Sequence, residues 1–502
     1  MDVASLALSR MLGLAVVVLG SCLIPLGPIE AQSPVGTPLY PLTDDNYISY
    51  PLPPSAPQYG SISGKRMKAD VNELVAISRQ SHDDGNQFWG RITGTQYDAK
   101  ARQWVMAKMK KIGLETREEP MQLPPMWFPS HWEFSVATPQ KTVLLHTAHP
   151  VQESPSTPPG GVELEAAWVG LGTPADFQGR DVRGKAVFIF AVPEPGTLVT
   201  SALRNGATKR AEDNGAVAVI LVVGIPGNME HQMLTFGAKV PSFSMGQEDG
   251  DTVRQMMEQA PQGQPPKIRF SLTASKVSGL STGSVWGVLP GMTDENIMVM
   301  AHHDGYFYAA MDNAAGVATL LALAEYFSHV PKEKRRRTIS FVTFATHHEP
   351  DELWGHWVMS SMRPFLQKTA LIMNCEHTGL TEFYSYGGTI RRTDGVAARR
   401  VALSGSQILT DVLMNAMRLF GVTTYYERDA IPLGEIRAFA EAAPVFQTIR
   451  NGVFYHSDHD IPDTVPAAGM EELTRAYAKA IDDVNQHDID DLRASKTTRA
   501  PQ

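Results

Sequence analysis

The chain is poor in cysteine, in charge and in long apolar runs. Only two of its 502 residues are cysteines, Cys22 and Cys375, so a disulfide framework is excluded. Charged residues make up 19% of the chain, the net charge is -9 and no dense basic run occurs, so binding to a polynucleotide is not expected. No apolar stretch reaches the roughly 20 residues that a membrane-spanning helix needs. The remaining class is an ordinary globular protein with a substantial core.

The first 31 residues have the pattern of an export signal. Arg10 supplies a positive charge, residues 11–24 form an apolar segment, and a small-residue end follows at 29–31. Prolines after the apolar segment argue against an uncleaved membrane anchor. The alternative is lipoprotein cleavage, which would leave Cys22 carrying a lipid. We therefore expect export to a periplasmic or extracellular location, with a lipoprotein as the alternative.

Changes in composition divide the rest of the chain. Helical patterns cover residues 70–81 and 97–112, and a proline-rich break follows at 119–132. Short β runs between Gly and Pro residues then indicate a small inserted domain. The predicted units are a signal peptide (1–31), an extended lead-in (32–66), an α/β domain (67–132 and 281–487), a β-rich insert (133–280) and a polar tail (488–502).

From residue 296 onward, strands and helices alternate. Apolar runs at 297–301, 338–345 and 370–374 are typical of buried strands, and a helical stripe covers 312–330. This alternation predicts an α/β fold in which a parallel sheet carries helices on both faces. Such sheets bind ligands outside the carboxyl ends of their strands.

Histidines and carboxylates gather where these strands end. Four short clusters hold seven of the 15 histidines. The clusters are His302, His303 and Asp304; His347, His348 and Glu349; Glu376 and His377; and His456, Asp458, His459 and Asp460. Imidazole plus carboxylate is a ligand set that suits zinc, so the clusters predict a metal site at one edge of the sheet.

Two stretches near these clusters carry the motifs of a known family. Residues 302–304 fit a His-x-Asp motif, and residues 312–316, Asp-Asn-Ala-Ala-Gly, are close to Asp-Asn-Ala-Ser-Gly. Over about residues 69–130 and 281–485 the chain resembles the co-catalytic di-zinc metallopeptidases, which include bacterial leucyl aminopeptidases and glutamate carboxypeptidases. The resemblance implies the zinc exopeptidase fold, a mixed, mostly parallel sheet flanked by helices, and two zinc ions.

The insert shows a second, weaker resemblance. The strand at 184–188, the helix after it and the strand at 215–220 are similar to a protease-associated domain. That family is noncatalytic, which implies a role in substrate access or partner contacts. A generic small α/β domain is the alternative.

The di-zinc resemblance assigns roles residue by residue. It implies that His302 binds one zinc, that Asp304 orients His302, and that Asp312 bridges both metals. Glu376 takes the place of the acidic ligand after the third strand. His456 matches the last histidine ligand.

The chain departs from the family at a pair of adjacent glutamates, one the general base and the other a zinc ligand. Counted along the strand, their positions hold His347 and His348; counted back from residues 353–355, they hold Glu349 and Pro350. The first count makes His348 a neutral ligand, which is expected to weaken the binding of one zinc ion. The candidates for the base are His347 and Glu349, with a site that has no base as the third option.

These features predict an exported zinc-dependent exopeptidase, first of all an aminopeptidase, that cleaves peptides or small proteins with metal-activated water. The alternative is a noncatalytic relative that binds peptides or a partner, because the glutamate pair is missing.

Overall fold

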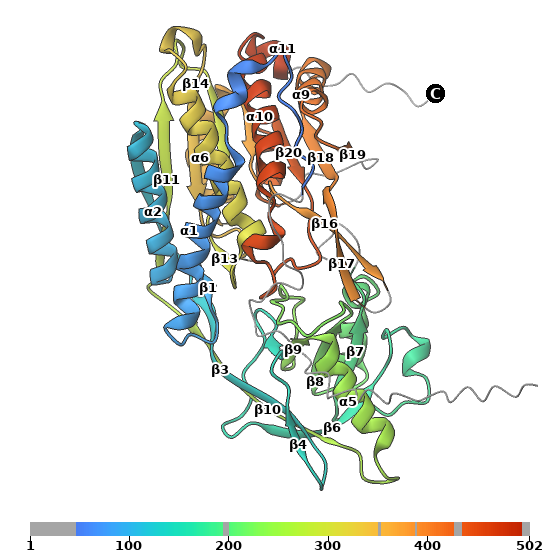
Figure 1. The fold of residues 1–502 in the computed structure, drawn as a ribbon. Coiled ribbons are helices and arrows are strands. Elements are labelled where there is room, and N and C mark those ends of the chain that lie inside the picture. The colour runs from blue at the N-terminus through green and yellow to red at the C-terminus, as the bar shows by residue number, and fades with distance from the viewer. Residues whose placement is uncertain (1–46, 194–199, 350–352, 387–388, 426–433, 494–502) are drawn as a thin grey trace, which may run out of the picture.

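A mixed sheet of eight strands forms the frame of the α/β unit (Figure 1). The computed structural model describes residues 47–193, 200–349, 353–386, 389–425 and 434–493. The strand order is β19-β18-β20-β15-β12-β14-β11-β2, and its central strands β14, β12, β15 and β20 are parallel. The strands span β2 Glu115–Gln122, β11 Ser281–Leu289, β12 Asn296–His302, β14 Thr338–Phe344, β15 Thr369–Asn374, β18 Arg399–Ser404, β19 Thr424–Tyr425 and β20 Val445–Ile449.

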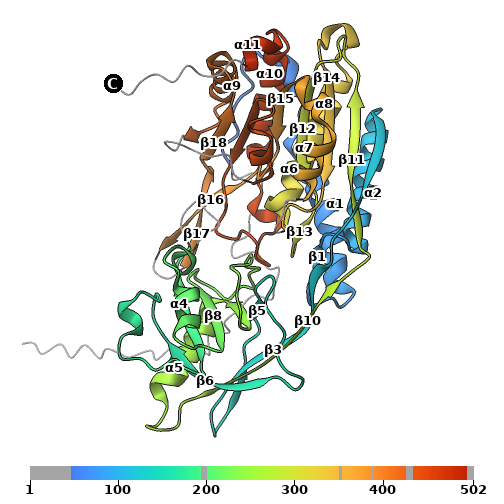
Figure 2. The same cartoon turned by 180° about the vertical axis from the view of Figure 1, so that it is seen from behind.

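Both faces of this sheet are buried, as the apolar runs predicted. Along β12, Ile297, Val299 and Ala301 enter one core while Met298 and Met300 enter another, because successive side chains of a strand point to opposite faces. The helices of the first core lie in front of the sheet in Figure 1, and the second core is seen from behind in Figure 2. The first core is covered by α1 Gly64–Asp83, α2 Gln96–Ile112, α6 Ala315–Ser328, α9 Gln407–Leu419, α10 Ala467–Val484 and α11 Ile489–Arg493, and the second by α7 Leu353–Ser361 and α8 Arg363–Gln367.

A second sheet of eight strands forms the insert. Its order is β4-β3-β10-β6-β7-β8-β9-β5, and β6 to β9 run parallel, with helices between β7 and β8 as predicted. Its strands and helices are β3 Met126–Ala137, β4 Thr142–Leu144, β5 His149–Pro150, β6 Val162–Trp168, β7 Ala186–Ala191, α3 Ser201–Arg204, α4 Ala207–Asp213, β8 Ala218–Val223, β9 Ser242–Met245, α5 Gln247–Gln259 and β10 Lys267–Val277. Two small pairs complete the fold: β1 Gly90–Arg91 with β13 Gly305–Tyr306, and β16 Thr381–Tyr386 with β17 Thr389–Val396.

Several boundaries differ from the predicted ones. The chain enters the insert between β2 and β3, earlier than residue 133, because β3 pairs with β10 from Met126 onward. The end of the predicted lead-in joins the core, since Tyr59 is buried and its hydroxyl donates to Asp482 (2.8 Å). The predicted tail begins with α11, whose Leu492 is fully buried.

The start of helix α6 also differs from the predicted one, and this difference explains where Asp312 lies. The helical pattern began at Asp312, but Asp312 and Asn313 have non-helical backbone angles and the regular helix starts at Ala315. The preceding irregular turn, Ala310–Ala314, is fully buried. It carries the Asp312 side chain to the carboxyl ends of the strands rather than along the helix.

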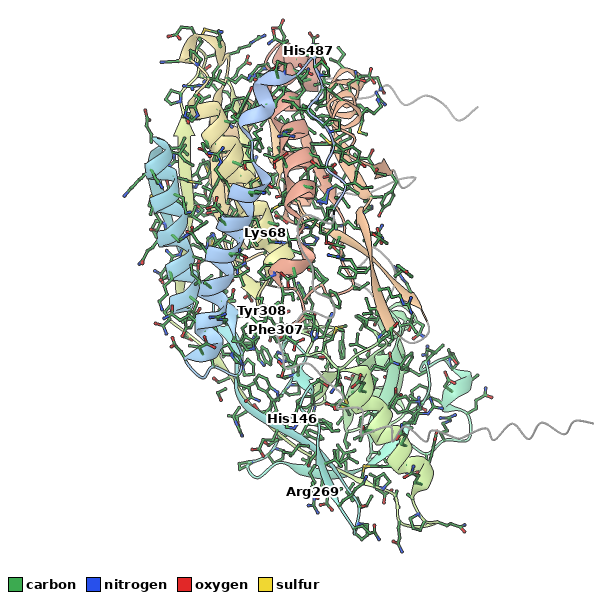
Figure 3. All side chains as sticks on the ribbon, viewed as in Figure 1. Lys68, His146, Arg269, Phe307, Tyr308 and His487 are labelled. Atoms are coloured by element: carbon green, nitrogen blue, oxygen red, sulfur yellow. The ribbon has the colours of Figure 1, made fainter. Side chains whose placement is uncertain are left out.

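The insert lies beneath the carboxyl ends of the central strands (Figures 1 and 2). An aromatic cluster joins the two units: the rings of Phe307 and Phe88 pack against His149 of the insert, at 5.2 Å and 6.3 Å. Phe307 and Tyr308 mark this junction in Figure 3. Within the described ranges, no helix has the length and apolarity to cross a bilayer. The predicted signal segment, with Cys22, lies outside the described residues.

Candidate metal centre

The four predicted clusters meet at one edge of the α/β sheet. His302 ends β12, His347 and His348 follow β14, Glu376 follows β15, and His456 lies on the loop after β20. These four strands are parallel neighbours, so their carboxyl ends share one edge. All five side chains are buried or nearly so.

The carboxylate of Asp312 lies at the middle of this group and faces four imidazoles. Its Oδ1 atom is 3.1 Å from His302 Nε2 and 3.2 Å from His377 Nε2. Its Oδ2 atom is 3.1 Å from both His348 Nε2 and His456 Nε2. We call His302 and His377, together with Glu376, the Oδ1 half of the centre, and His348 and His456 the Oδ2 half.

The Oδ1 half continues into a second group of potential ligand atoms. His302, His347, Glu376 and Glu435 each offer one ligand atom within 4.8 Å of the others. His347 Nδ1 is 3.0 Å from Glu435 Oε2, and its Nε2 is 3.7 Å from Glu376 Oε1. The Asn374 amide donates to Glu376 Oε2 (2.8 Å) and fixes that carboxylate.

Two further carboxylates hold the centre in place. Asp304 reaches both halves, because His302 Nδ1 lies 3.3 Å from its Oδ1 and His348 Nδ1 donates to its Oδ2 (3.2 Å). The prediction gave Asp304 the first of these contacts only. Asp460 accepts backbone N–H bonds from Met311 (2.8 Å) and Asp312 (3.1 Å), so the turn that carries Asp312 is tied down.

The tautomers of the imidazoles direct nitrogen lone pairs toward a position where a cation could bind. His348 Nδ1 donates to Asp304, and His377 Nδ1 donates to the carbonyl of Arg450 (3.1 Å). In a neutral ring the other nitrogen then carries a lone pair, and here that nitrogen faces a carboxylate oxygen of Asp312. Two lone pairs at about 3 Å repel each other unless a cation lies between them.

The charges in the centre fit the same conclusion. Burial lowers the pKa of His348, but Asp312 and Asp304 outweigh it and raise that pKa to about 9, so without a metal ion a proton on Nε2 would supply the positive charge beside Asp312. Burial and the Glu435 carboxylate raise the pKa of Glu376 well above its ordinary value. In the described part of the chain, Glu435 Oε1 and the Nε2 atoms of His302 and His456 are buried without a hydrogen bond. The residues present therefore fit metal ions, which would supply the positive charge that these groups face.

The backbone is also strained here. His377 and His456 have φ angles of 50° and 56°, in the left-handed region that non-glycine residues rarely adopt. Each such residue costs about 1–3 kcal/mol, so surrounding contacts must hold it. Residues of this kind gather at functional sites.

The structure does not bring every candidate into the centre. Glu349 is outside both groups of ligand atoms, and its charged neighbours include Asp304 and, from the insert, Glu153 and Lys276. Burial and then the Asp304 charge raise the pKa of Glu349 to about 7. His303 points away and pairs with Asp98 (3.0 Å).

Two residues in the centre were missed as candidate site residues. His377 lies in a predicted cluster, but only its left-handed backbone turns the ring toward Asp312, and sequence does not show such an angle. Glu435 had a weak signal, because residues 434–439 imperfectly resemble a Ser-Asp-x-x-x-Phe loop of the di-zinc metallopeptidases.

Known proteins share this sequence pattern and this fold. Residues 284–481 match the model of peptidase family M28. Among curated proteins, aminopeptidase YwaD of Bacillus subtilis is 24% identical over 258 residues, which cover 50% of each chain. A Zea mays protein named probable glutamate carboxypeptidase VP8 is 23% identical over 295 residues, which cover 46% of this chain and 40% of the relative. The chain thus spans half or less of the length of these relatives.

Solved structures extend the likeness to the whole fold. A peptidase M28 precursor from Shewanella amazonensis superposes with a TM-score of 0.69 at 20% identity, over 92% of this chain and 100% of that one. A zinc aminopeptidase from Bacillus subtilis gives 0.60 at 17% identity, over 86% and 98%. At these identities the superpositions show a shared fold.

Proposed function

We propose that the chain, whose residues 284–481 match the model of peptidase family M28, is a zinc-dependent exopeptidase, first of all an aminopeptidase. The observation that carries the proposal is the Asp312 carboxylate, which has two imidazoles at each oxygen. One carboxylate shared in this way is suited to hold two metal ions side by side. The family's named aminopeptidases support the substrate class.

The ligands of the two metals divide along the two halves. In the Oδ1 half, His302, Glu376 and Asp312 would hold one zinc, and His377 of the same predicted cluster adds a donor to which the family motifs gave no role. In the Oδ2 half, His348, His456 and Asp312 would hold the other. Nitrogen and oxygen donors of this kind suit zinc. Bound zinc would supply Lewis acidity toward the scissile carbonyl and would make water more acidic.

We assign His347 as the general base. Its Nδ1 lies 3.0 Å from Glu435 Oε2, so the carboxylate would keep the proton on Nδ1 and leave Nε2 free to accept one. The ring also stacks on His302 at 4.2 Å, which places it beside the metal ligands. Glu349, the other candidate, has Asp304 and His348 among its charged neighbours but offers no atom to either group of ligand atoms.

Two finer features belong to the same proposal. The insert is of the protease-associated type, supported by its parallel strands β6 to β9 with helices between β7 and β8. The chain is exported, supported by the charge at Arg10 and the apolar residues 11–24.

The test is hydrolysis of a panel of aminoacyl amides and dipeptides by the full chain, with zinc and with a strong chelator. We expect turnover that the chelator abolishes and zinc restores. His302→Ala should lose this activity, whereas His131→Ala, at an exposed position of the insert, should keep it. A folded chain that binds zinc but cleaves no member of the panel would favour the peptide-binding alternative. Full activity of His302→Ala would overturn the proposal.

A further inference from the structure

The insert touches the Oδ2 half of the metal centre in two places. The side-chain amide of Gln152 donates to the carbonyl oxygen of His348 (2.9 Å). The backbone N–H of Gln232 donates to the carbonyl oxygen of His456 (2.8 Å). Both contacts cross from the insert to the α/β unit, and both end on residues whose rings face Asp312 Oδ2. The insert therefore reaches the two histidines of one half directly.

The second contact is part of a longer clamp. The backbone N–H of Asp458 donates to the carbonyl of Glu230 (3.2 Å), and His231 forms an antiparallel β-bridge with Ser457. Residues 230–232 thus pair with the loop that carries His456. Because His456 has a left-handed backbone, which is strained for a residue other than glycine, this pairing supplies part of what holds it there.

The two glutamines form one rigid element of the insert. Gln152 and Gln232 are 6% and 1% exposed. The Gln232 side chain donates to the carbonyl of Met233 (2.9 Å) and contacts His149 Nε2 (3.0 Å), while the backbone N–H of Gln152 donates to the same carbonyl (3.0 Å). Contacts within the insert therefore hold both donors in place beside the metal centre.

The Oδ1 half is held by the α/β unit itself. His302 belongs to β12, in the middle of the sheet. The backbone carbonyl of His377 accepts a hydrogen bond from Arg399 Nη1 (2.8 Å). The backbone N–H of His377 donates to Asn313 Oδ1 (3.1 Å). None of these described contacts comes from the insert.

We propose that Gln152 and Gln232 are positioning residues for the metal of the Oδ2 half, so that the insert sets the affinity of that metal. The inference rests on the proposed metal centre. It assigns the insert a part in building the site, beyond the predicted role in substrate access. Partners that bind a ligating ring itself commonly change metal affinity by about 10–100-fold when they are removed; these donors bind the backbone carbonyls of the two ligands, so we expect the lower end of that range, about tenfold.

The experiment is a zinc titration of the full chain against a chromophoric chelator. Gln152→Met keeps the side-chain length but removes the donor, and Gln232→Ala removes the contacts that shape the clamp. Gln255→Met, at an exposed position of α5 in the same insert, is the matched control. His456→Ala identifies which binding step belongs to the Oδ2 half, because it deletes a ligand of that half. Thermal unfolding of each metal-free variant checks that it is folded.

We expect Gln152→Met to weaken that step by about tenfold. Gln232→Ala keeps its backbone donor to His456 but loses the side-chain contacts that hold that donor, so it should weaken the same step by less. The other step and the Gln255→Met control should stay unchanged. Unchanged affinity in both variants, or equal weakening of both steps, would overturn the inference while leaving the metal centre intact. A wild-type chain that binds fewer than two zinc ions would overturn the proposed centre, and the inference with it.

Discussion

The two halves of the metal centre differ in what holds them. The Oδ1 half stands on the sheet: His302 ends β12, and His377 follows β15 and is tied to Arg399 of β18. The Oδ2 half stands on loops: His348 lies in the turn after β14, His456 on the loop after β20, and both accept hydrogen bonds from the insert. One half is thus a product of regular secondary structure, and the other depends on contacts between two units of the chain.

The largest effect is expected where the halves join. Asp312→Ala removes the ligand that both share, so neither metal should remain and kcat/KM should fall by at least about 10⁴-fold, because each function of a catalytic metal is worth several kcal/mol. Zinc content and kcat/KM of the purified variant measure this. A variant that kept one zinc and measurable turnover would show that the halves are independent sites.

The next effect concerns the base beside the Oδ1 half. His347→Ala should lower kcat by about 10²–10⁴-fold without loss of zinc, since it removes a proton acceptor but leaves the ligands. Glu349→Gln, which removes the proton acceptor at the alternative position, should leave kcat near the wild-type value. Reversed effects in the two variants would identify Glu349 as the base and would place the chemistry on the side of the Oδ2 half.

Charge predicts that the two metals differ in affinity. The Oδ1 half has Glu376, with Glu435 nearby, in addition to the shared Asp312, whereas the described ligands of the Oδ2 half add only neutral imidazoles. The Oδ2 metal should therefore be removed first by a chelator, with dissociation constants at least about tenfold apart. Stepwise removal followed by zinc analysis measures the order, and His456→Ala, which should lose only the weaker step, assigns it. If His456→Ala lost the tighter zinc-binding step instead, the metal of the Oδ2 half would be the more tightly bound of the two.

The smallest effect concerns the support behind the Oδ1 half, where Glu472 of α10 lies near Arg399. Burial raises the pKa of Glu472 to about 8, although Arg399 lowers it, against an ordinary value of 4.5. The folded state then binds more protons than the unfolded state between these values, so this residue makes the chain less stable as pH rises from about 4.5 to 8. Glu472→Gln should remove this loss of unfolding free energy between the two pH values. The loss amounts to a few kcal/mol at most, at about 1.4 kcal/mol per pKa unit. Unfolding in urea at several pH values checks it, and an unchanged slope would contradict the raised pKa.

The sequence predicts much of the sheet and little of the loops. The apolar run at 297–301 became β12 Asn296–His302, and the ligand clusters lie at parallel strand ends because apolar period and strand direction fix that edge. Asp312 is close to the centre because an irregular turn precedes α6. The helical pattern in the sequence did not predict this turn. The ligand roles of these residues stay predictions.

The parts that could not be predicted depend on tertiary structure. The ring of His377 reaches Asp312 through a left-handed backbone, and Glu435 reaches His347 from a turn far along the chain. Gln152 and Gln232 belong to no motif, since backbone carbonyls accept from any donor that the fold brings near. Such contacts are set by how the insert docks, which no local pattern in the sequence encodes.

The central claim is that one carboxylate, Asp312, holds a metal at each oxygen. The most direct measurement is a crystal structure of the zinc-loaded chain, with anomalous scattering recorded at the zinc edge. We expect two zinc peaks, one among Asp312 Oδ1, His302 and Glu376, and one among Asp312 Oδ2, His348 and His456. A single peak, or a zinc bound away from Asp312, would contradict it.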